Sequence, residues 1–219
     1  MCFSAQASFA GAIVLTSVGI PTLLKARHTV KLIPFAAIPI LFALQQALEG
    51  IVWVTLVNGS RASVWHQWAV YGFIYFAGMV WPIWIPTSLY VAEYDNVRKK
   101  MLAALIVVGV GLALCSLNAI AHTKQTAEVM NNHIVYTLLD DPLGSLSQAI
   151  GLVVYLLGTV GSFFVSSLNN IWVLGVVLGI AWIISIVGYY LAFGSIWCFF
   201  VAMSSVMIYY IVVEQVCDQ

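Results

Sequence analysis

Residues 32–57 read LIPFAAIPILFALQQALEGIVWVTLV, and this stretch decides the fold. It is long enough to cross a bilayer, because a membrane-spanning helix needs about 20 mostly apolar residues. Its second half nevertheless contains Gln45, Gln46 and Glu49, with Trp53 one turn further on. Gln45, Gln46 and Trp53 each stand three or four residues from Glu49, so the four side chains share one helix face. A carboxylate in hydrocarbon is costly, and we therefore predict that this face looks into a bundle of membrane helices.

The composition indicates a membrane protein. Of the 219 residues, 63% are hydrophobic and only 7% are charged, whereas soluble domains carry about 25% charged residues. Seven apolar stretches reach spanning length. They predict a single integral membrane domain over residues 1–219, of the all-α class, built as a seven-transmembrane-helix bundle. The predicted spans lie near residues 5–24, 32–57, 67–92, 101–121, 146–167, 171–192 and 195–214, with one long outer loop at 122–145.

Basic residues orient the bundle, since cytoplasmic loops carry an excess of lysine and arginine. The second and fourth connections hold one basic residue each, Arg61 and Lys124. The first and third connections hold the others, Lys25, Arg27, Lys31, Arg98, Lys99 and Lys100. We therefore predict an outside N-terminus and a cytoplasmic C-terminus for a multi-pass membrane protein. The net charge is zero and no basic stripe exists, which excludes a nucleic-acid partner.

Glu49 has two interpretations. As a functional residue it is a proton-accepting carboxylate or a metal ligand, because charged groups at membrane depth are usually functional. As a structural residue it is part of an interhelical network of amide and carboxyl groups. We predict a pocket open to the outer side, with its floor formed by the second span and its rim by the N-terminal tail, the outer loop and the last span. The floor residues are Gln45, Gln46, Glu49 and Trp53, and the rim residues are Trp197, Cys2, Cys198 and His133.

The cysteines also leave alternatives open. Cys2 and Cys198 both fall at the outer surface, where an oxidising compartment allows a disulfide that ties the N-terminus to the last span. The other interpretations are a thiolate metal site and two free buried thiols. Cys115, which lies in the outer third of the fourth span, is expected to pack inside the bundle.

A metal site is conceivable on the outer side but has no local motif. The chain contains neither an HxxxH nor an HExxH spacing. A site has to be assembled from separate helices and the long loop, with His133, His66, Glu49 and Asp140 as the candidate ligands. A transition metal is therefore the only cofactor that we consider, and its identity is open.

Two further segments carry expectations. Residues 81–86 read WPIWIP, and prolines four residues apart each remove a backbone donor, so we expect an irregular helix whose freed carbonyls face the bundle. Residues 133–136 read HIVY, which indicates a short strand or a segment lying on the bundle. On the inner side, we expect Glu93 to lie in a solvated position.

Several motifs carry a resemblance. Residues 1–9 read MCFSAQASF, and residues 39–53 contain the pattern P-x-x-F-x-x-Q-Q-x-x-E-G-x-x-W. Residues 133–136 match an H-x-I-x-Y loop with a shortened spacing, and residues 195–200 read SIWCFF. In these motifs, along its whole length, the chain resembles an uncharacterised family of small bacterial multi-spanning membrane proteins. The resemblance implies the bacterial inner (cytoplasmic) membrane as the location. It supports this choice of residues and implies no activity.

The leading hypothesis is a membrane protein that binds a small molecule or ion in its pocket for sensing or transport, with Glu49 as the protonatable residue. The first alternative is a membrane-embedded, metal-dependent enzyme, since seven spans with an outside N-terminus are similar to the zinc-dependent hydrolases of the alkaline ceramidase type. This chain lacks the helix-borne histidine spacing of those hydrolases. The second alternative is a structural subunit. The expected partners are the lipid bilayer, the ligand, and further copies in a homo-oligomer or a larger membrane complex.

Overall fold

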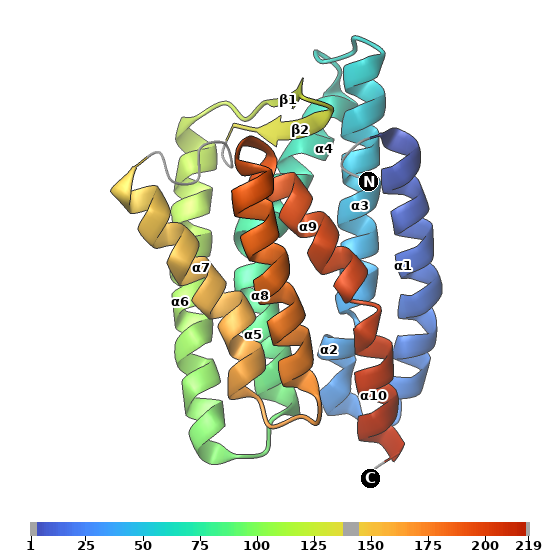
Figure 1. Ribbon diagram of the computed structural model, residues 1–219, viewed down its shortest axis with the longest axis vertical. Coiled ribbons are helices and arrows are strands. Elements are labelled where there is room, and N and C mark those ends of the chain that lie inside the picture. The colour runs from blue at the N-terminus through green and yellow to red at the C-terminus, as the bar shows by residue number, and fades with distance from the viewer. Residues whose placement is uncertain (1–3, 138–144, 218–219) are drawn as a thin grey trace.

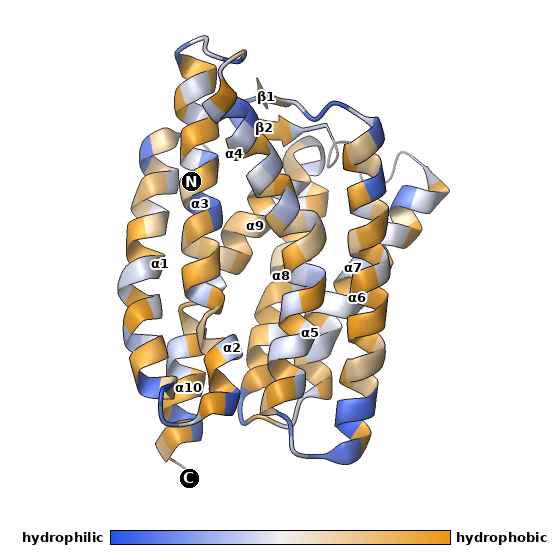
Figure 2. Cartoon of the chain, turned by 180° about the vertical axis from the view of Figure 1, so that it is seen from behind, coloured by the Kyte–Doolittle hydropathy of each residue, from blue (hydrophilic) through white to orange (hydrophobic). Residues whose placement is uncertain are grey.

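The computed structural model describes residues 4–137 and 145–217. Within these ranges seven helical segments are long and apolar enough to cross a membrane, and they lie side by side as a bundle (Figure 1). The predicted all-α class is confirmed. The hydropathy of the chain agrees with this architecture, because apolar residues cover the length of the helices and hydrophilic residues gather at the two ends (Figure 2).

The spans are built from the following elements. The first is α1 (Ala5–Ala26), and the second combines η1 (Val30–Leu32), α2 (Ile33–Ala36) and α3 (Ile38–Val57). The third combines α4 (Val64–Tyr75), η2 (Phe76–Val80) and α5 (Trp81–Ala92), and the fourth is α6 (Asn96–His122). Then come the strands β1 (Ala127–Met130) and β2 (His133–Tyr136), α7 (Leu146–Val165) and α8 (Ile171–Gly188). The last span combines η3 (Tyr190–Ala192), α9 (Phe193–Ser204) and α10 (Met207–Cys217).

The two strands form an antiparallel hairpin that lies over the end of the bundle where the N-terminus is found, opposite the C-terminus (Figure 1). Asn131 and Asn132 join the strands with φ angles of 49° and 62°, values that two-residue hairpin turns require and that asparagine tolerates. Tyr136 is buried and stacks on Phe73 of α4, with ring centroids 4.3 Å apart. The hairpin therefore packs on the helices through β2.

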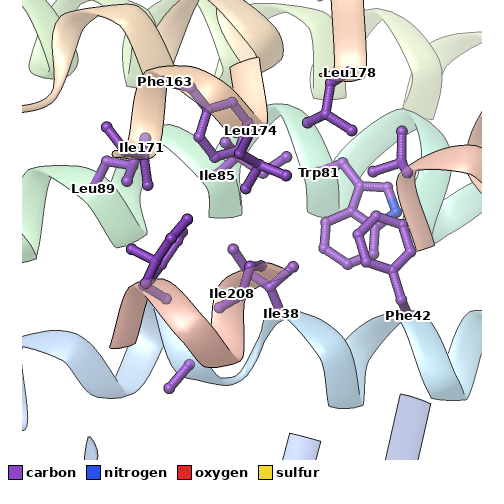
Figure 3. Packing of buried hydrophobic residues seen from close by; sticks show 14 of the residues in the cluster. Ile38, Phe42, Trp81, Ile85, Leu89, Phe163, Ile171, Leu174, Leu178 and Ile208 are labelled. Atoms are coloured by element: carbon purple, nitrogen blue, oxygen red, sulfur yellow. The ribbon is translucent and has the colours of Figure 1, made fainter. Parts of the chain in front are cut away.

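The largest apolar cluster lies between the second, third, fifth, sixth and last spans (Figure 3). Phe42 of α3 and Trp81 of α5 stack at its edge, with ring centroids 3.8 Å apart. Ile85, Phe163 and Leu178 extend the cluster from α5, α7 and α8. This packing fixes α3 against α5, and it thereby sets where the polar face of α3 points.

The irregularity expected from the prolines is a π-helix, η2, which ends at Val80, two residues before Pro82. Pro86 has no N–H, so the carbonyl of Pro82 lacks its usual donor inside the helix. This carbonyl packs against Gly109 of α6, where an added Cβ atom would lie only 2.0 Å from the Pro82 oxygen. The absence of a side chain at Gly109 thus lets α6 approach the backbone of α5 at the point that proline has opened.

We predict that Gly109→Ala destabilises the protein by about 1–3 kcal/mol, because overpacking forces the two helices apart. Gly111→Ala is the matched control, since a Cβ atom at Gly111 meets nothing within 4 Å and alanine favours a helix. The measurement is the free energy of unfolding of the detergent-solubilised protein, followed by tryptophan fluorescence. Equal effects of the two substitutions would contradict the close contact.

Glu93, which we expected to be solvated, is fully buried at the end of the bundle that holds the C-terminus, and that expectation was wrong (Figure 1). Its carboxylate accepts hydrogen bonds from the backbone N–H groups of Tyr94 and Asp95 at 2.9 and 3.0 Å. Ser167 donates to it from its N–H at 2.7 Å and from its hydroxyl at 2.5 Å. Burial alone would raise the pKa of Glu93, but these hydrogen bonds outweigh it and hold the pKa below its usual value. The carboxylate therefore joins the α5–α6 connection to the α7–α8 connection.

This arrangement makes stability depend on pH. Because the pKa of Glu93 is lower in the folded than in the unfolded protein, its stabilisation is present above the unfolded pKa of about 4.3 and is lost as the pH falls through the folded pKa. We predict that Glu93→Gln lowers the free energy of unfolding at pH 7 by about 1.5–3 kcal/mol and flattens its acid dependence. The control is Glu128→Gln, which removes only an exposed ion pair with Arg61 and should change little. An unchanged acid dependence in Glu93→Gln would contradict the prediction.

Candidate functional site

Gln45 links three helices in the interior of the bundle. The indole N–H of Trp81, on α5, donates to Gln45 Oε1 at 2.7 Å. Gln45 Nε2 in turn donates to the Sγ atom of Cys198, on α9, at 3.4 Å. Gln45 is 0% exposed. An unpaired amide in hydrocarbon would be costly, so this chain of donors and acceptors holds α5, α3 and α9 in register.

Glu49 lies one turn further along α3 and is also 0% exposed. The hydroxyl of Ser195, on α9, donates to Glu49 Oε1. Among the described residues, Glu49 Oε2 has no hydrogen-bond partner. The Gln46 amide is near enough to interact with the carboxylate, but neither of its polar atoms makes a hydrogen bond of ordinary length and angle within the described residues. The buried acid is therefore held on one side only.

Two tryptophans lie beside these groups. Trp53 is 5% exposed and packs in the apolar cluster that also contains Tyr136 and Cys198. Trp197 is 6% exposed and is held between two rings: that of Phe193, stacked at 6.0 Å, and that of Tyr155, edge-on at 5.5 Å. Neither indole N–H has a hydrogen-bond partner among the described residues.

A cavity of about 290 Å³ lies on the other side of α9. Its walls come from η2, α6, α7 and α9. The lining residues are Ala77, Gly78, Leu112, Cys115, Ser116, Ala119, Gln148, Gly151, Leu152, Tyr155, Phe193, Gly194, Trp197 and Cys198. Ala119 and Gln148 stand close to the end of α6 and the start of α7, so the cavity occupies the half of the bundle nearer the hairpin. The π-helix η2 forms part of its wall through Ala77 and Gly78.

The cavity differs in its lining from the pocket that the sequence indicated. Trp197 lines it, as does Cys198. Gln45, Gln46, Glu49 and Trp53 are not among its lining residues. They lie behind α9, because Ser195 and Cys198 of that helix take up the hydrogen bonds from Glu49 and Gln45. Helix α9 therefore has one face on the cavity and another on the buried polar groups.

The candidate metal ligands each have other neighbours. His66 is buried, and its Nδ1 lies 2.7 Å from the hydroxyl of Thr55. His133 packs edge-on against Tyr189, with ring centroids 5.2 Å apart, and burial lowers its pKa. Asp140 lies outside the described residues. Within the described part of the chain, no group of three His, Cys, Asp or Glu side chains is placed to hold a metal ion.

The structure shows no disulfide at Cys198. Cys198 is a free, buried cysteine, and its predicted partner Cys2 lies outside the described residues. Cys115 is free and exposed, and it lines the cavity, so the expectation that it packs inside the bundle was wrong.

Several residues of the site were not singled out from the sequence. Ser195 is the partner of Glu49, and the SIWCFF motif that contains it was the one signal for it. Trp81 is the donor to Gln45, although the sequence suggested only a proline-containing segment. Tyr155 and Gly151 of α7 line the cavity, and they stand in an apolar helix whose pattern does not distinguish them from lipid-facing residues.

Comparisons with known proteins give a family but no activity. A family model described as "Family of unknown function (DUF6629)" matches residues 1–218. No curated protein and no solved structure matches the chain. The chemistry of the site therefore has to be argued from the geometry.

The Glu49–Ser195 hydrogen bond predicts energetic coupling between α3 and α9. In a double-mutant cycle, Glu49→Leu and Ser195→Ala should couple by about 0.5–3 kcal/mol in the free energy of unfolding, since each substitution alone already removes this hydrogen bond. The control cycle pairs Glu49→Leu with Ser88→Ala, because Ser88 bonds to Ile85 of its own helix. That pair should be additive within about 0.5 kcal/mol. Additivity in the first cycle would contradict the interaction.

Proposed function

We propose that this chain, which belongs to the family of unknown function DUF6629, is a multi-pass membrane protein that binds a small molecule within the membrane for sensing or transport. The seven apolar helices support the membrane location. The binding function is supported by the cavity and by the polar groups that adjoin it through α9.

The observation that carries the proposal is the double role of α9. Ligand pockets are mostly apolar, contain a few polar groups, and measure about 300–1,000 Å³. The cavity has this character and stands near the lower limit of that range, at about 290 Å³. A molecule in the cavity would contact Trp197 and Cys198. Cys198 in turn accepts a hydrogen bond from Gln45, which does not line the cavity. Occupancy and the environment of the buried polar groups are thereby connected.

Glu49 is the group on which such a connection would act. Its partner Ser195 stands between Gly194 and Ile196 in the chain, and Gly194 lines the cavity. A small shift or rotation of α9 therefore changes the hydrogen bond to the carboxyl group. We propose that Glu49 is the protonatable residue of the protein and that ligand binding and proton binding at Glu49 influence each other, as linked equilibria must.

The orientation is part of the proposal. Most of the basic residues lie at the end of the bundle that holds the C-terminus, and this end is hydrophilic in Figure 2. By the rule that basic loops stay in the cytoplasm, the N-terminus, the hairpin and the cavity half face outward. We propose the bacterial inner membrane as the location, because the sequence motifs resemble those of a family of bacterial membrane proteins.

The enzyme alternative has less support from the described geometry. The nucleophilic side chain bonded to the buried acid is Ser195, but Ser195 is not among the residues that line the cavity. Cys198 does line the cavity, and its Sγ atom faces an amide donor, Gln45, and not a base. A disulfide from Cys2 would have to use the same Sγ atom. The structural-subunit alternative explains the hydrogen bonds between α3, α5 and α9 but gives no reason for the cavity beside them.

The test is native mass spectrometry of the protein released directly from membranes. We predict a bound small molecule whose occupancy falls at least about tenfold in Gly151→Phe. Gly151 lines the cavity, and an added Cβ atom there meets nothing within 4 Å, so the new ring can enter the space without displacing the helices.

The matched control for this experiment is Gly161→Phe. Gly161 stands on the same helix, has equal room for a Cβ atom, and is not among the residues that line the cavity. The occupancy of the bound molecule in Gly161→Phe should equal that in the unaltered protein. A bound mass that survives in Gly151→Phe, or a protein released without any bound molecule, would count against the proposed function.

A further inference from the structure

We propose that the cavity takes a neutral, largely apolar molecule that carries a hydrogen-bond acceptor, and that this molecule reaches the cavity from the lipid, between α6 and α7. The inference rests on the proposed binding function and specifies its ligand class. The cavity supplies three constraints, which concern charge, hydrogen bonding and access.

The first constraint is charge. Among the described residues that line the cavity there is no aspartate, glutamate, lysine or arginine. A carboxylate, an ammonium group or a metal ion placed there would be desolvated without a counter-charge, which is strongly unfavourable. The buried carboxylate of Glu49 does not line the cavity and is engaged with Ser195. The lining therefore selects a neutral molecule.

The second constraint is hydrogen bonding. The indole of Trp197 lines the cavity and is fixed between the rings of Tyr155 and Phe193. Its N–H is buried and makes no hydrogen bond with any described residue. An indole N–H can only donate, so the group that complements it must be an acceptor such as a ketone, ester, ether or hydroxyl oxygen. A pure hydrocarbon would leave this donor unpaired, which is costly.

The third constraint is access. The lining residues Cys115 and Gln148 are exposed, whereas Trp197 and Cys198 at the opposite wall are buried. Cys115 belongs to α6, and only 6% of the apolar stretch of this helix is buried inside the bundle. In the membrane, α6 is therefore surrounded mostly by lipid chains. At the water-facing end, Val135 of β2 packs on Ala192 and Ile196 and covers the start of the α9 wall. The open side of the cavity is therefore its lipid side.

A photoreactive ketone tests the class directly. Benzophenone is neutral and apolar and carries one carbonyl acceptor, and irradiation links it to neighbouring C–H groups. With the full-length protein in detergent, we expect its adducts to map to α6, α7 and α9 and to fall about tenfold in Gly151→Phe but not in Gly161→Phe. The anionic analogue 4-benzoylbenzoate should label these peptides at least about tenfold less than benzophenone.

A competition experiment isolates the acceptor. Fluorenone and fluorene have nearly the same shape, but only fluorenone has a carbonyl oxygen. Fluorenone should displace benzophenone at about fivefold lower concentration than fluorene does, and Trp197→Phe should remove this preference. The matched control is Trp53→Phe, since Trp53 is also buried with an unpartnered N–H but does not line the cavity. This variant should keep the preference.

The same acceptor chemistry is offered by the ester carbonyl of a phospholipid. Phosphatidylcholine added to the solubilised protein will displace benzophenone if a phospholipid chain is the occupant, and it will leave the labelling unchanged if the occupant is a free lipophilic molecule. Both results agree with the inference, and they separate the two sources of the ligand.

Other results would overturn it. Equal labelling by 4-benzoylbenzoate, which is measured on the unaltered protein, or a fluorenone preference that persists in Trp197→Phe would reject the neutral acceptor class while leaving a binding cavity in place. Benzophenone labelling of α6, α7 and α9 that is the same in Gly151→Phe as in the unaltered protein would reject both the ligand class and the proposed function.

Discussion

The hydrogen bonds between α3 and α9 are the constraint on which the half of the bundle nearer the hairpin depends. An amide and a carboxyl group placed in hydrocarbon must find partners inside the protein, because lipid offers none. Here Gln45 and Glu49 find them in Cys198 and Ser195 of the last span. The residues of each pair are more than 140 positions apart in the chain, 153 and 146 respectively. These two bonds therefore decide which face of α9 turns toward α3, and consequently which face is left to line the cavity.

The backbone obeys the same rule. Proline in the third span removes donors and leaves carbonyl groups that must be accommodated within the bundle. The chain does this with small residues on α6, since Gly109 packs directly on the carbonyl of Pro82 and Ser116 approaches Gly78 in η2. Such contacts require the absence of side chains at defined positions. The same scarcity of large side chains around η2, where Ala77 and Gly78 line the cavity, leaves the space between α6, α7 and α9 unfilled.

These features explain what the sequence could and could not predict. Helix periodicity placed Gln45 and Glu49 on one face, and the cost of burying a carboxylate indicated that this face turns inward; both residues are indeed fully buried. Their partners could not be read from the chain, because Ser195 and Trp81 reach them through the packing of other spans. No sequence pattern indicated the cavity, since residues such as Gly151 and Ala119 contribute to it by having small side chains or none. Glu93 follows the end of a span directly and resembles a solvated residue, but the Ser167 loop closes over it.

The two ends of the bundle differ in how completely their polar groups are paired, and this difference assigns them different roles. At the end that holds the C-terminus, Glu93 has donors on both of its oxygens, from two connections, so movement there would break several charged hydrogen bonds at once. In the half nearer the hairpin, Glu49 is bonded through one oxygen, and the N–H groups of Trp53 and Trp197 have no partner among the described residues. Local opening takes place where fewer interactions must be broken. A change in the position of α9 is therefore least costly beside the cavity, where a bound molecule would supply the missing contacts, while the end that holds the C-terminus keeps the spans together.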